Sequence, residues 1–153
     1  MAKPDEKEIA GKKEQKEAEH RSAPSGRIVY RAILSEGREE LKRSSSALFW
    51  SGLAAGLSMG FSMISEGLLQ AHLPETEWRP LVVKLGYSIG FLIVVLGRQQ
   101  LFTENTLTPI LPLLIDRRKE MLWNVLRLWG VVLVANLLGA CMIAWVISSD
   151  GTP

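Results

Sequence analysis

The sequence predicts an all-α integral membrane protein with three membrane helices, the second of which is interrupted. Charged side chains are unevenly placed: residues 1–43 contain 20 of the 34 in the chain, which leaves 14 for the other 110 positions. The later part contains apolar stretches of the length that crosses the ~30 Å hydrocarbon core of a bilayer. A polar, proline-bearing segment interrupts one of them. This pattern indicates a polar tail followed by a membrane domain, and not one soluble domain.

The tail covers residues 1–43 and the membrane domain residues 44–153. Residues 1–26 contain too few apolar side chains to offset the entropy of folding, which is typical of a largely disordered segment. Residues 27–43 fit either an amphipathic helix on the membrane surface or a solvated lead-in to the first span. The tail carries 11 basic and 9 acidic side chains, and this near balance argues against a nucleic-acid-binding arm.

The first span is expected at about residues 47–69. It contains 19 consecutive uncharged residues, Ala47–Ser65, which as a helix would be about 28 Å long. Glycine recurs at every fourth position and forms a smooth ridge along one side, on which another helix can pack closely. The ridge consists of Gly52, Gly56 and Gly60. Glu66 follows this run, where it either lines an outer vestibule or simply marks the membrane interface.

The second span is expected at residues 81–115, broken at 98–108. Its apolar run ends near Gly97 and gives way to polar residues and to Pro109 and Pro112, which fit poorly inside a helix. Non-helical backbone at membrane depth requires partners from the protein or from a water-filled cavity. A helix, a polar re-entrant bend and a half-helix satisfy these features. The alternative is a polar loop just outside the membrane.

The third span is expected at residues 121–147. Leu128–Ile147 contains 20 uncharged residues, and its polar side chain Asn136 is expected to hydrogen-bond to another helix. Basic residues precede the first span and separate the second from the third, and this bias places the N-terminus in the cytoplasm. These basic residues are Arg38, Lys42 and Arg43 before the first span, and Arg117, Arg118 and Lys119 before the third.

The sequence LFTENT at residues 101–106 resembles the LFTxN signature of the formate/nitrite transporter family. The sequence ANLLGA at 135–140 is similar to the Asn-x-x-Gly element of that family's third helix. The resemblance extends over about residues 47–147. It implies an aquaporin-like protomer built from two inverted three-helix halves and assembled as a pentamer. In that case the chain corresponds to the N-terminal half, and a C-terminal half or another chain completes it.

The same resemblance implies a set of pathway residues. Leu101, Phe102 and Thr103 would form the pore constriction, with Phe102 as a hydrophobic gate and Thr103 as a polar contact for the anion or for a pore histidine. Asn105 would hold the loop. Asn136 and Gly139 would take part in helix packing, together with the glycine ridge.

Three residues depart from the family's pattern. Gln100 stands where Glu is usual, Glu104 stands between Thr and Asn where a small residue is usual, and Arg98 also replaces a small residue. We assign Arg98 and Glu104 to the pathway as well. A charge at membrane depth requires a partner, and Glu104 is the candidate partner for Arg98.

The function expected from the resemblance is transport of small monovalent anions, such as formate or nitrite, by a channel or by proton-coupled transport. The expected location is the inner membrane, as a multi-pass homo-oligomer with lipid and small anions as partners. No nucleophile–base set, phosphate-binding glycine loop or metal-ligand spacing is present in the sequence, so we expect no enzymatic activity, cofactor, metal or nucleic acid. The alternative is a non-transporting three-helix protein that acts in interaction or assembly.

Overall fold

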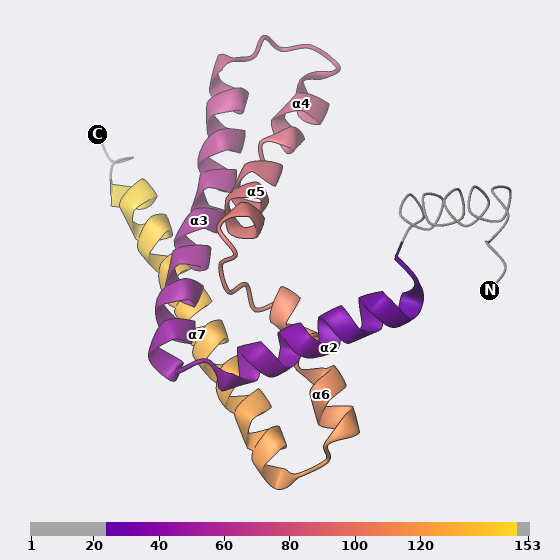
Figure 1. The fold of residues 1–153 in the computed structure, drawn as a ribbon. Helices are drawn as coiled ribbons and strands as arrows, with labels where there is room; N and C mark the ends of the chain where they lie inside the picture. The colour runs from indigo at the N-terminus through magenta and orange to yellow at the C-terminus, as the bar shows by residue number, and fades with distance from the viewer. Residues whose placement is uncertain (1–23, 150–153) are drawn as a thin grey trace, which may run out of the picture. The chain divides into compact units, whose positions relative to one another are not determined.

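A computed structural model describes residues 24–149, and every regular element within them is a helix (Figure 1). The chain divides into two compact units, Met1–Ala32 and Ile33–Pro153. Residues 1–23 of the predicted tail lie outside the part of the chain that the structure describes. The elements in chain order are α2 (Gly26–Lys42), α3 (Ser45–His72), α4 (Arg79–Leu85), α5 (Ser88–Leu96), the 3-10 helix η1 (Glu104–Thr106), α6 (Ile110–Ile115) and α7 (Lys119–Ser149).

Three helical segments within residues 24–149 are long and apolar enough to cross a membrane. They are α3 with 28 residues, the segment Arg79–Leu96 with 18, and α7 with 31. The prediction of an all-α protein with three membrane helices is therefore confirmed in length and composition. Most large apolar side chains on these helices are exposed, among them Leu96 and Trp145. Such surfaces require lipid or other helices around them.

The ends of α3 follow ordinary capping chemistry. The Ser44 hydroxyl oxygen accepts a hydrogen bond of 3.2 Å from the Ala47 amide, which satisfies one of the free N–H groups of the first turn. The helix ends at His72, shortly before Pro74, which lacks an amide hydrogen to continue the ladder. Observed α3 is therefore longer at both ends than the predicted span 47–69.

The second span consists of two helices, which the sequence did not predict. Between α4 and α5, Gly86 and Tyr87 form a turn, and Ser62 of α3 supplies partners for the backbone there. The Ser62 hydroxyl donates to the Tyr87 carbonyl at 2.5 Å and accepts from the Gly90 amide at 3.0 Å. This side chain is buried, so one hydroxyl both satisfies the turn and joins α5 to α3.

After α5 the chain has no α-helix until α6. The short helix α6 begins immediately after Pro109 and contains Pro112 in its first turn, where a missing amide hydrogen costs nothing. Pro112 therefore does not break a helix, contrary to the prediction that both prolines oppose one. In Figure 1, α6 and α7 form a hairpin in which α6 returns beside the first turns of α7.

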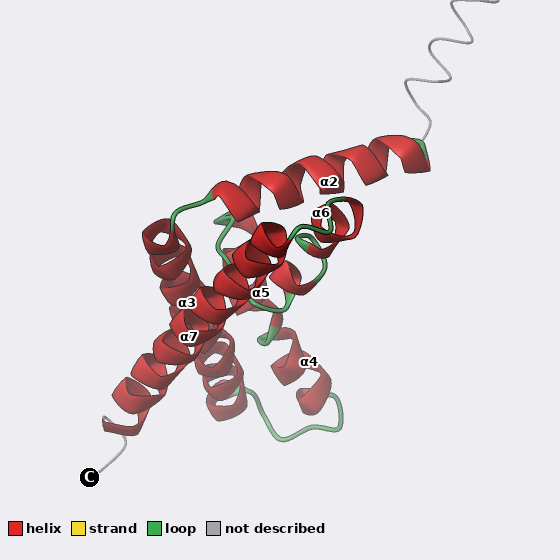
Figure 2. Cartoon of the chain, turned by 90° about the horizontal axis from the view of Figure 1, so that it is seen from below, coloured by secondary structure: helices red, strands yellow, loops and turns green. Residues whose placement is uncertain are grey.

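Helices α3 and α7 form the main contact of the larger unit, and both views show them crossing closely (Figures 1 and 2). At one end of this contact lies an apolar cluster, to which α2 contributes. The cluster consists of Leu41, Leu48, Val125, Leu128 and Val132. Gly37 of α2 lies so close to the Thr108 carbonyl that an added Cβ would overlap it. Residues 33–43 thus belong to the larger compact unit, and the predicted boundary between tail and membrane domain after residue 43 stays a prediction.

Candidate functional site

The interruption begins at the end of α5, where the helix closes in a Schellman arrangement. The Arg98 amide donates to the Val95 carbonyl at 3.2 Å, and the Gln99 amide to the Val94 carbonyl at 3.0 Å. Arg98 has φ 46°, the single non-glycine residue with positive φ in the described part of the chain. Glycine is usual at this position because a side chain there is strained. Here Gly97 precedes the left-handed residue, and Arg98 carries the strain.

Asn136 of α7 holds the segment that follows. Its amide nitrogen donates to the Gly52 carbonyl at 2.7 Å and to the Gln100 carbonyl at 2.9 Å. Its amide oxygen accepts from the Phe102 backbone N–H at 2.8 Å. One side chain therefore joins α7, α3 and the interruption, and it provides partners for backbone groups that no helix satisfies.

Asn105 closes the loop from within. Its amide donates to the Gln100 side-chain oxygen at 2.7 Å and to the Leu101 carbonyl at 3.2 Å. The Trp129 indole N–H donates to the Asn105 carbonyl at 2.9 Å. Only 5% of Asn105 and 6% of Gln100 is exposed. Ser51 completes the set, since its hydroxyl accepts from the Gln100 amide at 3.1 Å.

The three residues expected at the constriction occupy different environments. Phe102 is half-buried and packs against the apolar cluster between α3 and α7. Leu101 is half-buried, and Thr103 is exposed, with its carbonyl accepting from the Thr106 hydroxyl at 2.8 Å. None of the three lines either of the cavities described below.

A cavity of about 560 Å³ lies beside the interruption. We call it the loop cavity. Four carboxylates and two guanidinium groups line it, together with amide and hydroxyl groups, so formal negative charge is in excess. The charged residues are Glu36, Glu39, Glu40, Arg43, Arg98 and Glu104, and the polar ones are Gln99, Gln100, Asn105 and Thr108.

The expected ion pair between Arg98 and Glu104 does not form. Both residues are exposed and line the loop cavity, but the ion pair in this cavity joins Arg43 to Glu40 at 3.3 Å. The prediction rested on the cost of a charge in hydrocarbon. In the structure the left-handed turn places Arg98 on an open cavity, where it needs no protein partner.

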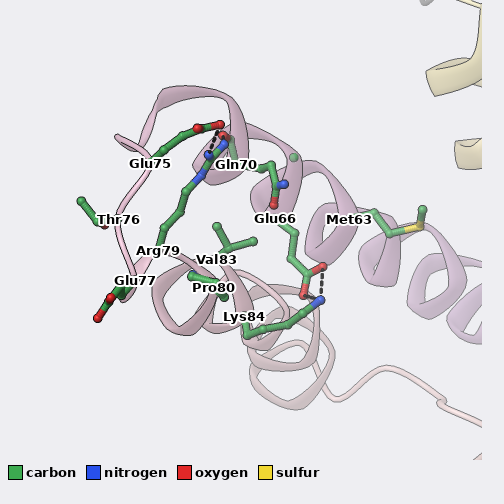
Figure 3. A pocket seen from close by; sticks show the side chains of 11 residues that line it. Met63, Glu66, Gln70, Glu75, Thr76, Glu77, Arg79, Pro80, Val83 and Lys84 are labelled. Carbon is green, nitrogen blue, oxygen red and sulfur yellow. Dashed lines mark hydrogen bonds and ion pairs between the residues drawn. The ribbon is translucent and has the colours of Figure 1, made fainter.

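A second cavity, of about 950 Å³, lies between α3 and α4 (Figure 3). We call it the hairpin cavity. Figure 3 shows Glu66 and Lys84 facing each other across it, with Lys84 Nζ 3.1 Å from a Glu66 carboxylate oxygen. Arg79 pairs with Glu75 and donates to the Gln70 carbonyl. Glu66 lies in the wall of this cavity, and both roles weighed for it, in an outer vestibule or at the membrane interface, stay predictions.

The glycine ridge of α3 faces α7. A Cβ at Gly56 would overlap the Asn136 carbonyl and lie 3.0 Å from the Gly139 Cα; one at Gly139 would lie 2.6 Å from the Leu53 carbonyl oxygen. A Cβ at Gly52 would approach the Ala135 Cβ at 3.0 Å, and one at Gly60 would overlap the Ile143 side chain. At Gly56 and Gly139 the obstacle is backbone, which cannot rotate away.

The connection between α6 and α7 carries an exposed ion pair of Asp116 with Arg118. The side-chain hydrogen bonds from Arg118 and its positive charge lower the pKa of Asp116 below the ordinary value of 3.8, although partial desolvation opposes this. Because folding lowers this pKa, the pair stabilises the folded chain above about pH 3.8. Its contribution is lost as the pH falls through the folded-state pKa.

We therefore expect the Arg118→Gln substitution to raise the pKa of Asp116 towards 3.8. A carboxyl-carbon NMR titration of the detergent-solubilised chain measures it directly. Arg117→Gln is the matched control, since Arg117 makes no contact with the Asp116 carboxylate. A titration of Asp116 that is identical in wild type and Arg118→Gln would contradict the assignment.

Sequence reasoning missed the residues that hold the loop from outside it. From the sequence, Ser51, Ser62 and Trp129 were assigned no role in holding the loop, and Gln100 was identified only as a departure from the family pattern. Arg127 donates to the Leu41 and Arg43 carbonyls at 3.1 and 3.0 Å and so closes the C-terminal end of α2. A polar side chain within or beside an apolar run was the available signal, but its partner lies up to 86 residues away in the chain. Within residues 24–149 no group of three or more His, Cys, Asp or Glu side chains is placed to hold a metal ion.

These features define a multi-pass α-helical membrane protein whose second span ends in an irregular segment held by side chains of the two neighbouring helices. The chain belongs to the formate/nitrite transporter family, whose family model matches residues 27–152. This confirms the resemblance of the LFTENT and ANLLGA segments.

Two curated relatives illustrate the match. The chain is 44% identical over 117 residues to the inner membrane protein YfdC of Escherichia coli (strain K12), which covers 76% of this chain and 38% of that relative. It is 25% identical over 120 residues to the uncharacterized transporter YrhG of Bacillus subtilis (strain 168), covering 76% of this chain and 44% of that relative. The chain thus spans less than half the length of either relative. No solved structure matches it.

Proposed function

We propose that this chain forms part of a pathway that carries small monovalent anions, such as formate or nitrite, across the inner membrane, as a channel or by proton-coupled transport. The observation that carries the proposal is the interruption between α5 and α6. Its backbone is held by half-buried side chains from two other helices, Ser51 of α3 and Asn136 of α7, and it borders the loop cavity. Irregular backbone with this support is how transporters build sites within a membrane.

We propose that the break predicted at residues 98–108 lies at membrane depth, as a re-entrant bend. The Phe102 backbone N–H donates to Asn136, and the Phe102 side chain packs on the apolar cluster. Part of the surface of this side chain is therefore already covered. Its remaining surface would serve as the gate, with Thr103 beside it as the polar contact. Because the chain is a member of a transporter family, transport is favoured over the alternative of a non-transporting interaction or assembly protein.

The charges of the loop cavity bear on the solute. The excess of carboxylates lowers the local concentration of anions, and Arg98, which makes no ion pair in the described structure, offsets it next to the loop. We therefore assign Arg98 to attracting the anion and Glu104 to opposing it. The Glu66–Lys84 pair lines the hairpin cavity, which would be the vestibule at the other end of the second span.

The rest of the proposed assembly is taken from the family resemblance. The chain supplies a three-helix half, and a C-terminal half or a second chain would complete the pathway within a homo-oligomer, a pentamer in the family resemblance. Because basic residues precede the first and third spans, we expect the N-terminus on the cytoplasmic side. The name of the Escherichia coli relative, inner membrane protein YfdC, supports the inner membrane as the location.

The test is uptake of formate and nitrite into proteoliposomes that contain this chain. We expect Thr103→Ala and Phe102→Ala to change the uptake rate severalfold, because both alter the proposed constriction. Phe61→Ala is the matched control: it removes an exposed phenyl ring from α3 that lines neither cavity, and the rate should stay the same.

In the same assay, Arg98→Gly tests the effect of the positive charge on uptake without changing the local fold. Glycine accepts the left-handed conformation without strain, so the end of α5 is kept while the positive charge is removed. We expect slower uptake of the anion, and a smaller difference at high ionic strength because salt screens the lost charge. Absence of uptake by inserted, folded protein would refute transport by this chain alone.

A further inference from the structure

A cationic corner lies at the connection between α6 and α7, apart from both cavities. Residues 116–120 contain three cations and two carboxylates, and Arg118 is paired with Asp116. Arg117 and Lys119 are exposed and make no ion pair in the described structure. The guanidinium group of Arg117 and the ammonium group of Lys119 are therefore available to bind an anion at this turn.

Arg38 of α2 adds a third cation to this corner. Its neighbour Gly37 packs on Thr108 and Pro112, where an added Cβ would lie 3.1 Å from the Pro112 Cγ. The Asp116 amide donates to the Pro112 carbonyl at 2.9 Å, one turn further along α6. Arg38 is exposed and makes no hydrogen bond or ion pair within residues 24–149, and its charge acts on Asp116 from this position.

Apolar side chains adjoin the same corner. On α7, Leu122 and Trp123 follow Lys119 at three and four positions and so share its face of the helix. Trp123 is 69% exposed and Leu122 46%. On α6, Leu114 and Ile115 are exposed immediately before the turn. Tryptophan prefers the depth of the lipid headgroups, next to the acyl chains.

We propose that this corner binds an anionic phospholipid, with its phosphate headgroup held by Arg38, Arg117 and Lys119 and its acyl chains against Leu122 and Trp123. The charges are complementary, and a soluble anion would leave the exposed apolar side chains uncovered. Basic pockets between membrane helices recognise anionic headgroups in this way. The site is separate from the proposed transport pathway and does not depend on it.

The experiment compares two spin-labelled lipids, phosphatidylglycerol and phosphatidylcholine, in phosphatidylcholine vesicles that contain the full chain. Electron paramagnetic resonance measures the fraction of each lipid that the protein immobilises. We expect the relative association constant of phosphatidylglycerol to exceed that of phosphatidylcholine by about two- to fivefold, since one cation near the surface contributes up to about fivefold. The preference should weaken at 1 M salt, where the Debye length is about 3 Å.

The variant carrying Arg38→Gln, Arg117→Gln and Lys119→Gln should bind both lipids about equally. Lys84→Gln is the control, because it removes an exposed cation near the other end of the second span, and the preference should persist. A wild-type chain without a preference would overturn the proposal whatever the variants do. So would a folded triple variant that keeps it, or inorganic phosphate that displaces the lipid better than chloride at equal ionic strength.

Discussion

Asn136→Ala is expected to lower the free energy of unfolding by about 2 to 4 kcal/mol. The substitution removes three hydrogen bonds and leaves the Phe102 N–H and the Gln100 carbonyl without their protein partner. Interhelical hydrogen bonds in membranes average only about 0.6 kcal/mol each. Buried backbone groups left unsatisfied cost about 1–3 kcal/mol each, and this second effect places the expected loss above the sum of three average bonds.

Unfolding of the detergent-solubilised chain by sodium dodecyl sulfate, followed by tryptophan fluorescence, measures this loss. Trp129 bonds to the loop through the Asn105 carbonyl, so its emission should also shift when the loop is released. Asn124→Ala is the matched control, since it removes the same side chain from the same helix but no hydrogen bond within the described residues. Equal destabilisation by the two substitutions would show that Asn136 does not hold the loop.

Gly56→Ala is expected to destabilise the chain by about 2 kcal/mol or more. The added methyl group would overlap the Asn136 carbonyl and crowd the Gly139 Cα. Both obstacles are backbone, so α3 and α7 must move apart, whereas a flexible side chain would turn aside. Overpacking in a close-packed contact costs about 1–3 kcal/mol. The same displacement would also stretch the hydrogen bonds of Asn136 to α3.

The same unfolding assay measures this loss. Gly67→Ala is the control on the same helix, because a Cβ there meets nothing within 4 Å; its effect should be smaller than about 1 kcal/mol. In the double variant Gly56→Ala/Asn136→Ala, the two losses should not add, since both act on one contact. Full additivity would show that the glycine contact and the loop are energetically independent. A Gly56→Ala substitution without effect on stability would refute the close approach of α3 and α7.

The spans were predictable because their signal is local. An uncharged run of sufficient length identifies a membrane helix without knowledge of its neighbours, and α3 and α7 each contain such a run. The second span reaches the necessary length only through α4 and α5 together. Helix ends were predicted less well. The apolar run was expected to end near Gly97, yet the left-handed residue is Arg98, because the hydrogen bonds to Val94 and Val95 determine which residue takes that conformation.

The loop was predictable as an interruption but not in its contacts. Its polar residues and Pro109 indicated that no helix continues there. The environment of Phe102 and the separation of Arg98 from Glu104 depend on how α2 and α7 pack, which no periodicity encodes. The turn between α4 and α5 was missed for the same reason, since Ser62 supports it from another helix.

By itself, the sequence determined the class of the protein: apolar length selects membrane helices, and the LFTENT and ANLLGA segments identify the family. Only the tertiary structure decided which side chains sustain the irregular backbone. A hydrophobic run favours the membrane through the solvation of its own side chains, so it can be recognised from the sequence alone. A hydrogen bond between Asn136 and the Phe102 amide joins residues 34 positions apart, and it exists only once the glycine contacts of α3 and α7 bring those helices together.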